Sequence, residues 1–293
     1  MHHDHDHGNA ALSLGGWLVL LSVVSAAMVY LLAVHRLRGR GIDWFPARSF
    51  AWIAGWVSVG TALVGPVADR APNDFVVHMA THILLGMLGP LLLVLAAPVT
   101  LTLRVLPVSA ARKIARFFAS PPLAVLTNPF IAGLLNVGGL WILYRTSLYT
   151  TMHAEPALHV LVHAHVLAAG YLFTFAVIGG PDPAPHRASP PWRAAALILA
   201  IAAHNILAKV IYADPPPGVP VDQAHAGAEL MYYAGAPVEV ILLVLVCRPW
   251  LLPRTRSSVD ERAVSTTGRS GASQRITARS RATSTSTETG LVR

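Results

Sequence analysis

The sequence predicts an all-α, polytopic membrane protein: a seven-transmembrane helix bundle with its N-terminus outside and its C-terminus cytoplasmic. Three observations support this prediction. Of the 293 residues, 54% are hydrophobic and 12% are charged, whereas soluble domains are about a quarter charged. Seven apolar stretches reach roughly the 20 residues that a helix needs to cross the hydrocarbon core. Basic residues gather in alternate loops, as the positive-inside rule requires.

The seven stretches are expected at residues 12–34, 50–66, 76–98, 123–143, 156–178, 193–212 and 228–249. Clusters of Arg and Lys follow the first, third, fifth and seventh stretches, while the other loops hold only Arg70 and Arg145. This alternation places the first, third, fifth and seventh stretches with their C-terminal ends in the cytoplasm. Residues 108–119 mix basic and aromatic side chains and predict a short amphipathic helix on the cytoplasmic surface.

Two polar tails are expected to flank the membrane domain of residues 12–250. Residues 1–11 form a His/Asp-rich extracytoplasmic tail, and residues 251–293 form an Arg/Ser/Thr-rich cytoplasmic tail that has too few apolar residues to fold. The formal net charge of +8 lies largely in that second tail, which holds eight Arg against Asp260, Glu261 and Glu288. The charge therefore gives no reason to expect a nucleic-acid partner.

Five histidines in three separate stretches are expected at similar depths below the outer membrane surface. They come from the third, fifth and sixth stretches and are His78, His82, His159, His163 and His204. The first four form two pairs with i,i+4 spacing, so the two rings of each pair share one helix face. Imidazoles are costly in hydrocarbon and favour a polar cavity. The set therefore predicts a metal site, while a lone His165 off that face predicts only helix packing.

The chemistry of the neighbouring residues points to copper. Cys247 is the single cysteine, so no pair of thiolates is available within one chain. Neutral imidazoles with thioethers from Met79, Met152 or Met231 suit copper better than calcium or magnesium, and zinc stays open. Further accessory residues are the carboxylates Glu229 and Glu239. A charge at mid-membrane is costly, so Glu239 is expected to be protonated, paired or facing a cavity.

The N-terminal segment Met1-His2-His3-Asp4-His5-Asp6-His7 is a separate candidate. A free amine with a histidine at position three can hold Cu(II) in a square plane, which makes His3 a further accessory ligand. An expression tag is the alternative interpretation of this segment.

Several of these motifs resemble one known family. The segment Phe75-Val-Val-His-Met-Ala-Thr-His82 resembles the F-x-x-H-M-x-x-H segment of the CtaG family of cytochrome c oxidase assembly factors, the seven-span type associated with caa3 oxidases. Further similarities, within residues 10–250, are His159-x-x-x-His163, the Gly-Pro after that stretch, His204 before Ile211-Tyr212, and Asp222-Gln223 before Gly227.

The resemblance implies a non-enzymatic chaperone of the respiratory chain. It would sit in the plasma membrane, contact cytochrome c oxidase subunits, and help to deliver or insert copper at the extracytoplasmic side. The five histidines would then be metal-site residues, with Asp222 and Gln223 as motif residues of undefined role.

Two alternatives remain open from the sequence. His82 and His163 are suitable axial ligands of a b-type haem, for electron transfer or haem handling. A copper transporter with Glu239 along its path is the other. A retinal protein is disfavoured because the last stretch holds no lysine, and a hydrolase because no H-E-x-x-H motif occurs.

Overall fold

A computed structural model describes residues 14–178 and 180–251. Every regular element in this part of the chain is helical, so the all-α class is confirmed. The N-terminal half holds α1 (Leu14–Gly39), α2 (Pro46–Leu63), α3 (Pro66–Arg70), α4 (Phe75–Ile83), the π-helical turn η1 (Leu84–Leu88), α5 (Gly89–Leu95), α6 (Pro98–Val105) and α7 (Val108–Phe118). The rest holds α8 (Pro121–Leu126), α9 (Pro129–Gly133), the π-helical turn η2 (Leu134–Gly138), α10 (Gly139–Arg145), α11 (Leu148–Ala154), α12 (Pro156–Ile178), α13 (Pro190–Ala213) and α14 (Val221–Leu251).

Six helical segments of the described chain are long and apolar enough to cross a membrane. They are Gly15–Gly39, Pro46–Arg70, Phe75–Val105, Pro156–Ile178, Pro190–Ala213 and Val221–Arg248. The expected span at residues 123–143 is divided, because α8 ends at Leu126 and Asn128 caps a new helix. The helical run from Pro129 to Arg145 is shorter than the other six. The chain is thus a multi-pass membrane protein, and seven spans and the orientation of the termini stay predictions.

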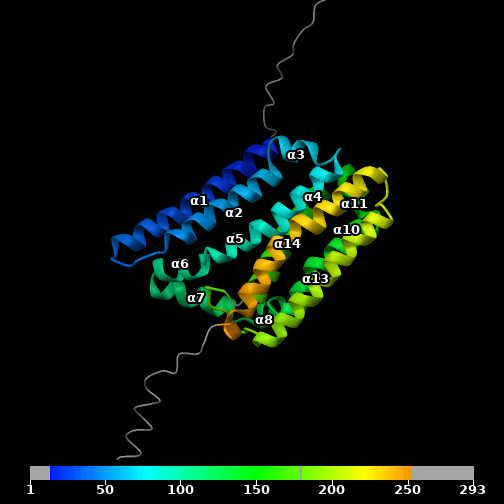
Figure 1. The fold of residues 1–293 in the computed structure, drawn as a ribbon. Helices are drawn as coiled ribbons and strands as arrows, with labels where there is room; N and C mark the ends of the chain where they lie inside the picture. Colours follow the sequence, from blue (N-terminus) through cyan, green and yellow to red (C-terminus); the bar gives the residue numbers. More distant parts are fainter. Residues whose placement is uncertain (1–13, 179, 252–293) are drawn as a thin grey trace, which may run out of the picture. The chain divides into compact units, whose positions relative to one another are not determined.

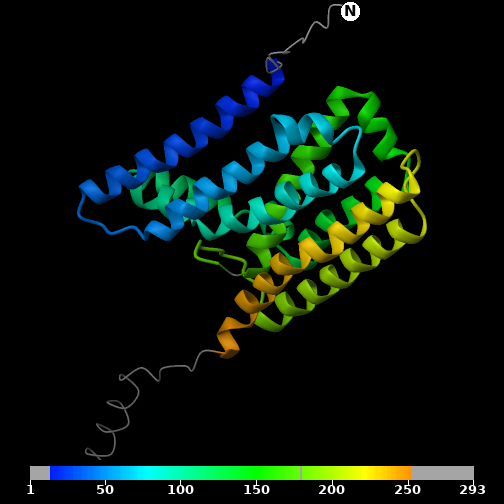
Figure 2. The same ribbon diagram turned by 45° about the horizontal axis from the view of Figure 1, so that its top comes forward.

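The helices run in alternating directions and their connections gather at two ends (Figure 1). At one end lie α3, the start of α4 and α11; at the other lie α6, α7 and α8. Figure 2 shows α1 and α2 side by side, with α13 and α14 paired on another part of the bundle. α12 packs against α5, η1, α9 and α13, so it lies at the centre and can present side chains to both halves.

Side-chain caps fix where α4 begins, and α4 carries two of the five histidines. Asp74 Oδ1 accepts hydrogen bonds from the backbone N–H groups of Val76 and Val77 at 2.9 and 3.1 Å, as an N-cap does. Gln223 Oε1 at the start of α14 accepts a third, from Phe75 N at 2.9 Å. Gln223 of the sequence motif therefore joins the starts of α4 and α14, whereas Asp222 is exposed in the first turn of α14.

Both π-helical turns lie at mid-helix, next to the site described below. Such turns bond i to i+5 and often mark functional positions. Glycine allows α12 to approach η1 closely: a Cβ on Gly170 would lie 2.2 Å from the carbonyl oxygen of Gly86. His165 also serves a π turn, since its Nε2 lies 3.1 Å from the Leu135 oxygen in η2, which fits the packing role expected for it.

Apolar side chains form several buried clusters, and others cover the outside of the bundle. One cluster centres on α12, α13 and α14, and a second lies towards α11. Large apolar residues such as Val29, Leu199 and Val240 are exposed, as lipid-facing positions are in a membrane protein. The expected tails, apart from Leu251, lie outside the described residues.

Candidate functional site: histidines around three cavities

The five predicted histidines border three neighbouring cavities rather than one common pocket. His78, His159 and His163 line a cavity of about 600 Å³, here called the wide cavity. His82 and His204 line one of about 40 Å³, called the buried cavity. Between them, the intermediate cavity of about 20 Å³ is bordered by His78, His82 and His163. The five histidines therefore form two groups. His78, His159 and His163 border the wide cavity, His82 and His204 border the buried cavity, and the intermediate cavity lies between them.

The wide cavity lies towards the end of the bundle that holds α3 and α11, and four imidazoles border it. His153 of α11 joins the three expected histidines. The ring centres of His78 and His153 are 6.0 Å apart, those of His153 and His159 are 6.2 Å apart, and His159 and His163 stack at 4.3 Å. The last distance is what i,i+4 spacing on one helix face produces.

Backbone carbonyls set the tautomers of two of these rings. His153 Nδ1 lies 2.7 Å from the Tyr149 oxygen, and His163 Nδ1 lies 2.9 Å from the His159 oxygen. Because a carbonyl can only accept, each Nδ1 carries the proton, and each Nε2 keeps its lone pair when the ring is neutral. His153 Nε2 is buried without a hydrogen-bond partner. This is the orientation that a metal-binding imidazole needs.

Two tyrosines border the histidine group. His78 Nε2 lies 3.0 Å from the Tyr144 hydroxyl. Tyr149 of α11 packs edge-on against the rings of His78 and His153 at 5.1 and 4.6 Å. Burial raises the pKa of Tyr149 to about 12, so this phenol stays protonated at neutral pH.

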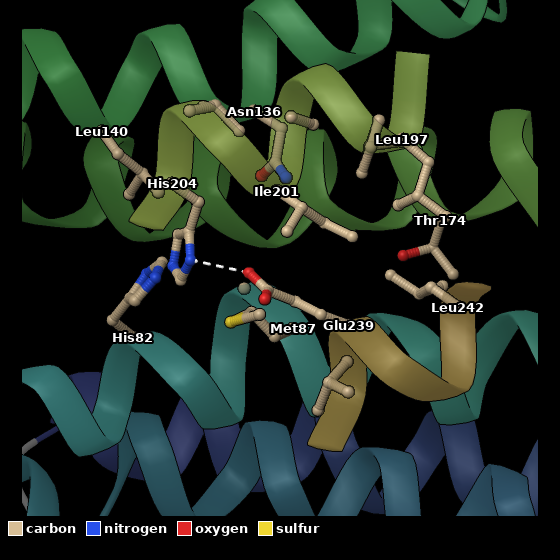
Figure 3. A pocket seen from close by; sticks show the side chains of 15 residues that line it. His82, Met87, Asn136, Leu140, Thr174, Leu197, Ile201, His204, Glu239 and Leu242 are labelled. Carbon is tan, nitrogen blue, oxygen red and sulfur yellow. Dashed lines mark ion pairs between the residues drawn. The ribbon is translucent and has the colours of Figure 1, made fainter. Parts of the chain in front are cut away.

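The buried cavity brings together α4, η1, α13 and α14 (Figure 3). His204 Nδ1 lies 2.9 Å from Glu239 Oε1, and Asn205 Nδ2 donates to Glu239 Oε2 at 3.2 Å. Glu239 is thus paired and faces a cavity, as its position required. The rings of His82 and His204 are 5.9 Å apart. Both nitrogens of His82 and both nitrogens of His204 are buried without a hydrogen-bond partner, since the contact of His204 Nδ1 with Glu239 is an ion pair.

Of the expected accessory residues, Glu239 lines the buried cavity and the others lie elsewhere. Met79, Met152 and Met231 are fully buried in the apolar cluster near α11 and do not line these cavities. Glu229 is exposed and shares a separate surface pocket with Lys209. The preference of copper for thioethers favoured these methionines, but packing buries them among Phe75, Tyr144 and other apolar side chains. His3 lies outside the described residues.

Sequence reasoning missed His153, Asn205 and Met87. His153 stands in a connection rather than a span, so a search for histidines within membrane stretches passes over it. Met87 borders the buried cavity because it lies in a π-helical turn. The spacing of apolar residues in the sequence does not predict such a turn. Within residues 14–178 and 180–251, no three His, Cys, Asp or Glu side chains stand ready to hold a metal ion.

Comparison with known proteins assigns the family. Uncharacterized proteins of Mycobacterium bovis and Mycobacterium tuberculosis are each 35% identical over 188 residues, which is 62% of this chain and 28% of theirs. One of Mycobacterium leprae is 32% identical over 177 residues, 58% of this chain and 27% of its own. The chain thus matches little more than a quarter of the length of these relatives.

No solved structure matches. The family described as cytochrome c oxidase caa3 assembly factor (Caa3_CtaG) matches residues 28–252, most of the membrane bundle and all of the histidines around the three cavities. This chain belongs to the cytochrome c oxidase caa3 assembly factor family.

Proposed function

We propose that this protein assists cytochrome c oxidase assembly in the plasma membrane by receiving copper at the extracytoplasmic side, in the wide cavity, and passing it to oxidase subunits. Copper is the cargo and the protein is a non-enzymatic chaperone. The observation that supports this most directly is the group of four imidazoles around the wide cavity. Imidazole is a good ligand for copper, and the single Cys247 supplies no pair of thiolates.

The arrangement of the rings suits a carrier that must release its ion. His153 and His163 keep an Nε2 lone pair available because helix carbonyls hold their Nδ1 protons. No third ligand is fixed beside any such pair among the described residues. A site with few fixed ligands binds less tightly than a closed tetrahedral one, which favours transfer over storage.

A copper titration of the purified full chain tests this proposal. We expect His159→Ala combined with His163→Ala to lower the copper bound per chain, measured by mass spectrometry of the metal. His165→Ala is the matched control, because this histidine is on the same helix but outside the three cavities. Equal copper content in both variants would overturn the wide cavity as the receiving site. In cells, the double variant should lower the copper content of the oxidase.

A haem held by His82 and His163 does not fit this arrangement. Pockets for ligands of that size measure at least about 300 Å³, whereas the cavities that His82 borders measure about 40 and 20 Å³. The absorption spectrum of the purified protein checks this conclusion, because a Soret band would contradict it.

A copper transporter is the second candidate, and one observation favours it. The wide, intermediate and buried cavities follow one another from His78 to Glu239. Copper uptake into sealed vesicles that contain the protein distinguishes this candidate, since a chaperone without a transport path produces none.

A further inference from the structure

We propose that the buried cavity is a second copper site, selective for Cu(I), with His82, His204 and Met87 as ligands and Glu239 as the group that orients His204. This inference rests on the proposed function, because it concerns the same cargo. It adds a site of different composition and assigns an oxidation state to the ion held there.

The first step is the orientation of His204. Glu239 Oε1 lies 2.9 Å from His204 Nδ1, and the amide of Asn205 donates to the other carboxylate oxygen at 3.2 Å. This ion-pair contact turns the Nδ1 edge of the His204 ring towards the carboxylate and leaves the other ring nitrogen, Nε2, as the candidate ligand atom. A carboxylate behind a histidine is the usual outer-shell partner of a metal-binding imidazole.

The second step is the unsatisfied chemistry of His82. His82 is 6% exposed, and neither of its ring nitrogens has a hydrogen-bond partner. Burying a polar atom without a partner is unfavourable, and both nitrogens of this imidazole are available to bind an ion. The ring centres of His82 and His204 lie 5.9 Å apart. Metal–nitrogen bonds are about 2 Å long, so one ion can bridge two such rings.

The third step is the thioether. In a π-helical turn the residue at i+5 takes roughly the place of i+4 in an α-helix, and η1 thereby turns Met87 towards the side of α4 that carries His82. Met87 and His204 line the same cavity (Figure 3). They also meet at Gly235, where a Cβ would lie 3.3 Å from His204 Cε1 and 3.5 Å from Met87 Sδ. The absence of a side chain at Gly235 lets both approach.

The fourth step is selectivity. Thioether ligands favour Cu(I), and imidazole accepts it. Charge supports the same choice, since the single carboxylate of Glu239 neutralises one Cu(I) ion but leaves a net charge beside a divalent ion. An uncompensated charge inside a membrane protein is costly. Calcium and magnesium require several oxygen ligands, and the described lining offers few oxygens.

X-ray absorption of the full chain loaded anaerobically with Cu(I) tests the proposal. We expect a sulfur neighbour of copper in the wild type and its loss in Met87→Leu, with a weaker affinity in competition with a Cu(I) chelator. Met79→Leu is the matched control, because Met79 is fully buried in the apolar cluster near α11. It should retain the sulfur signal. Circular dichroism and thermal unfolding show whether both variants fold.

The outcomes separate this inference from the proposed function. A wild-type spectrum without sulfur, or the same spectrum in both methionine variants, overturns the buried site. If His159→Ala with His163→Ala lowers copper content while the spectrum lacks sulfur, the proposed function stands and this inference fails. If that double variant leaves copper content unchanged while Met87→Leu removes the sulfur signal, the buried site stands and the wide cavity is not the receiving site.

Discussion

The wide and buried cavities differ in how the chain positions their histidines. In the wide cavity, His153 and His163 are held by carbonyls four residues earlier on their own helices. In the buried cavity, His204 is held by Glu239 of another helix, and His82 lies beside it from a third. The first arrangement forms with the local helix, whereas the second requires the packed bundle. Changes in packing should therefore affect the buried cavity first.

The largest expected effect comes from Gly170→Ala. Its Cβ would lie 2.2 Å from the Gly86 oxygen, a backbone atom of η1 that cannot rotate away. We expect a loss of about 3 kcal/mol in the free energy of unfolding and a loss of copper from the buried cavity. Unfolding in mixed micelles measures the first and X-ray absorption the second. Gly60→Ala is the control, because its Cβ would meet Val23 at an ordinary 3.7 Å; equal destabilisation by both would contradict the steric account.

Glu239→Gln should affect the buried cavity alone. Removing an outer-shell carboxylate typically weakens metal binding about 10- to 100-fold, so Cu(I) affinity of the sulfur-containing site should fall by that factor. Competition with a Cu(I) chelator measures it. Glu229→Gln on the same helix changes an exposed carboxylate outside the buried cavity and should leave the affinity as it is. Similar losses in both would indicate a general charge effect.

His153→Ala, in contrast to Glu239→Gln, should affect the wide cavity and not the buried one. It removes one imidazole from the wide cavity and its contact with the Tyr149 carbonyl, at a cost of about 1 kcal/mol in stability. The affinity of the wide-cavity histidines for copper should fall, while the sulfur signal of the buried cavity persists. Chelator competition with the Met87→Leu protein as background isolates the wide cavity. If the copper affinity of the wide cavity is unchanged, His153 is not one of its ligands.

Tyr149→Phe should give the smallest effect, and only in alkaline solution. Burial raises the pKa of Tyr149 to about 12, above the usual value of 10. The protonated phenol is thus favoured by folding, and its contribution to stability is complete below pH 10 and is lost as pH rises towards 12. Between pH 10 and pH 12, the temperature of thermal unfolding should fall more steeply for the wild type than for Tyr149→Phe. Parallel curves would contradict the pKa shift.

The helical class and most span boundaries could be predicted from the sequence because apolar length is a local property. The i,i+4 spacing of His159 and His163 also correctly predicted that their rings lie on one helix face, where they stack. The pair His78 and His82 has the same spacing but shares only the small intermediate cavity. His78 also borders the wide cavity and His82 the buried cavity, since the cavities succeed one another along the helix axis. Spacing along one helix cannot reveal where its neighbours leave space. The π-helical turns arise from packing and gave no sequence signal.

The shared walls of the three cavities have a consequence for any ion that moves through them. His78 and His163 border both the wide and the intermediate cavity, and His82 borders both the intermediate and the buried cavity. A copper ion that moved through them as proposed would gain its next nitrogen ligand before it left the previous one. Handover by such stepwise exchange keeps the ion coordinated throughout and avoids the barrier that a bare charge meets in hydrocarbon.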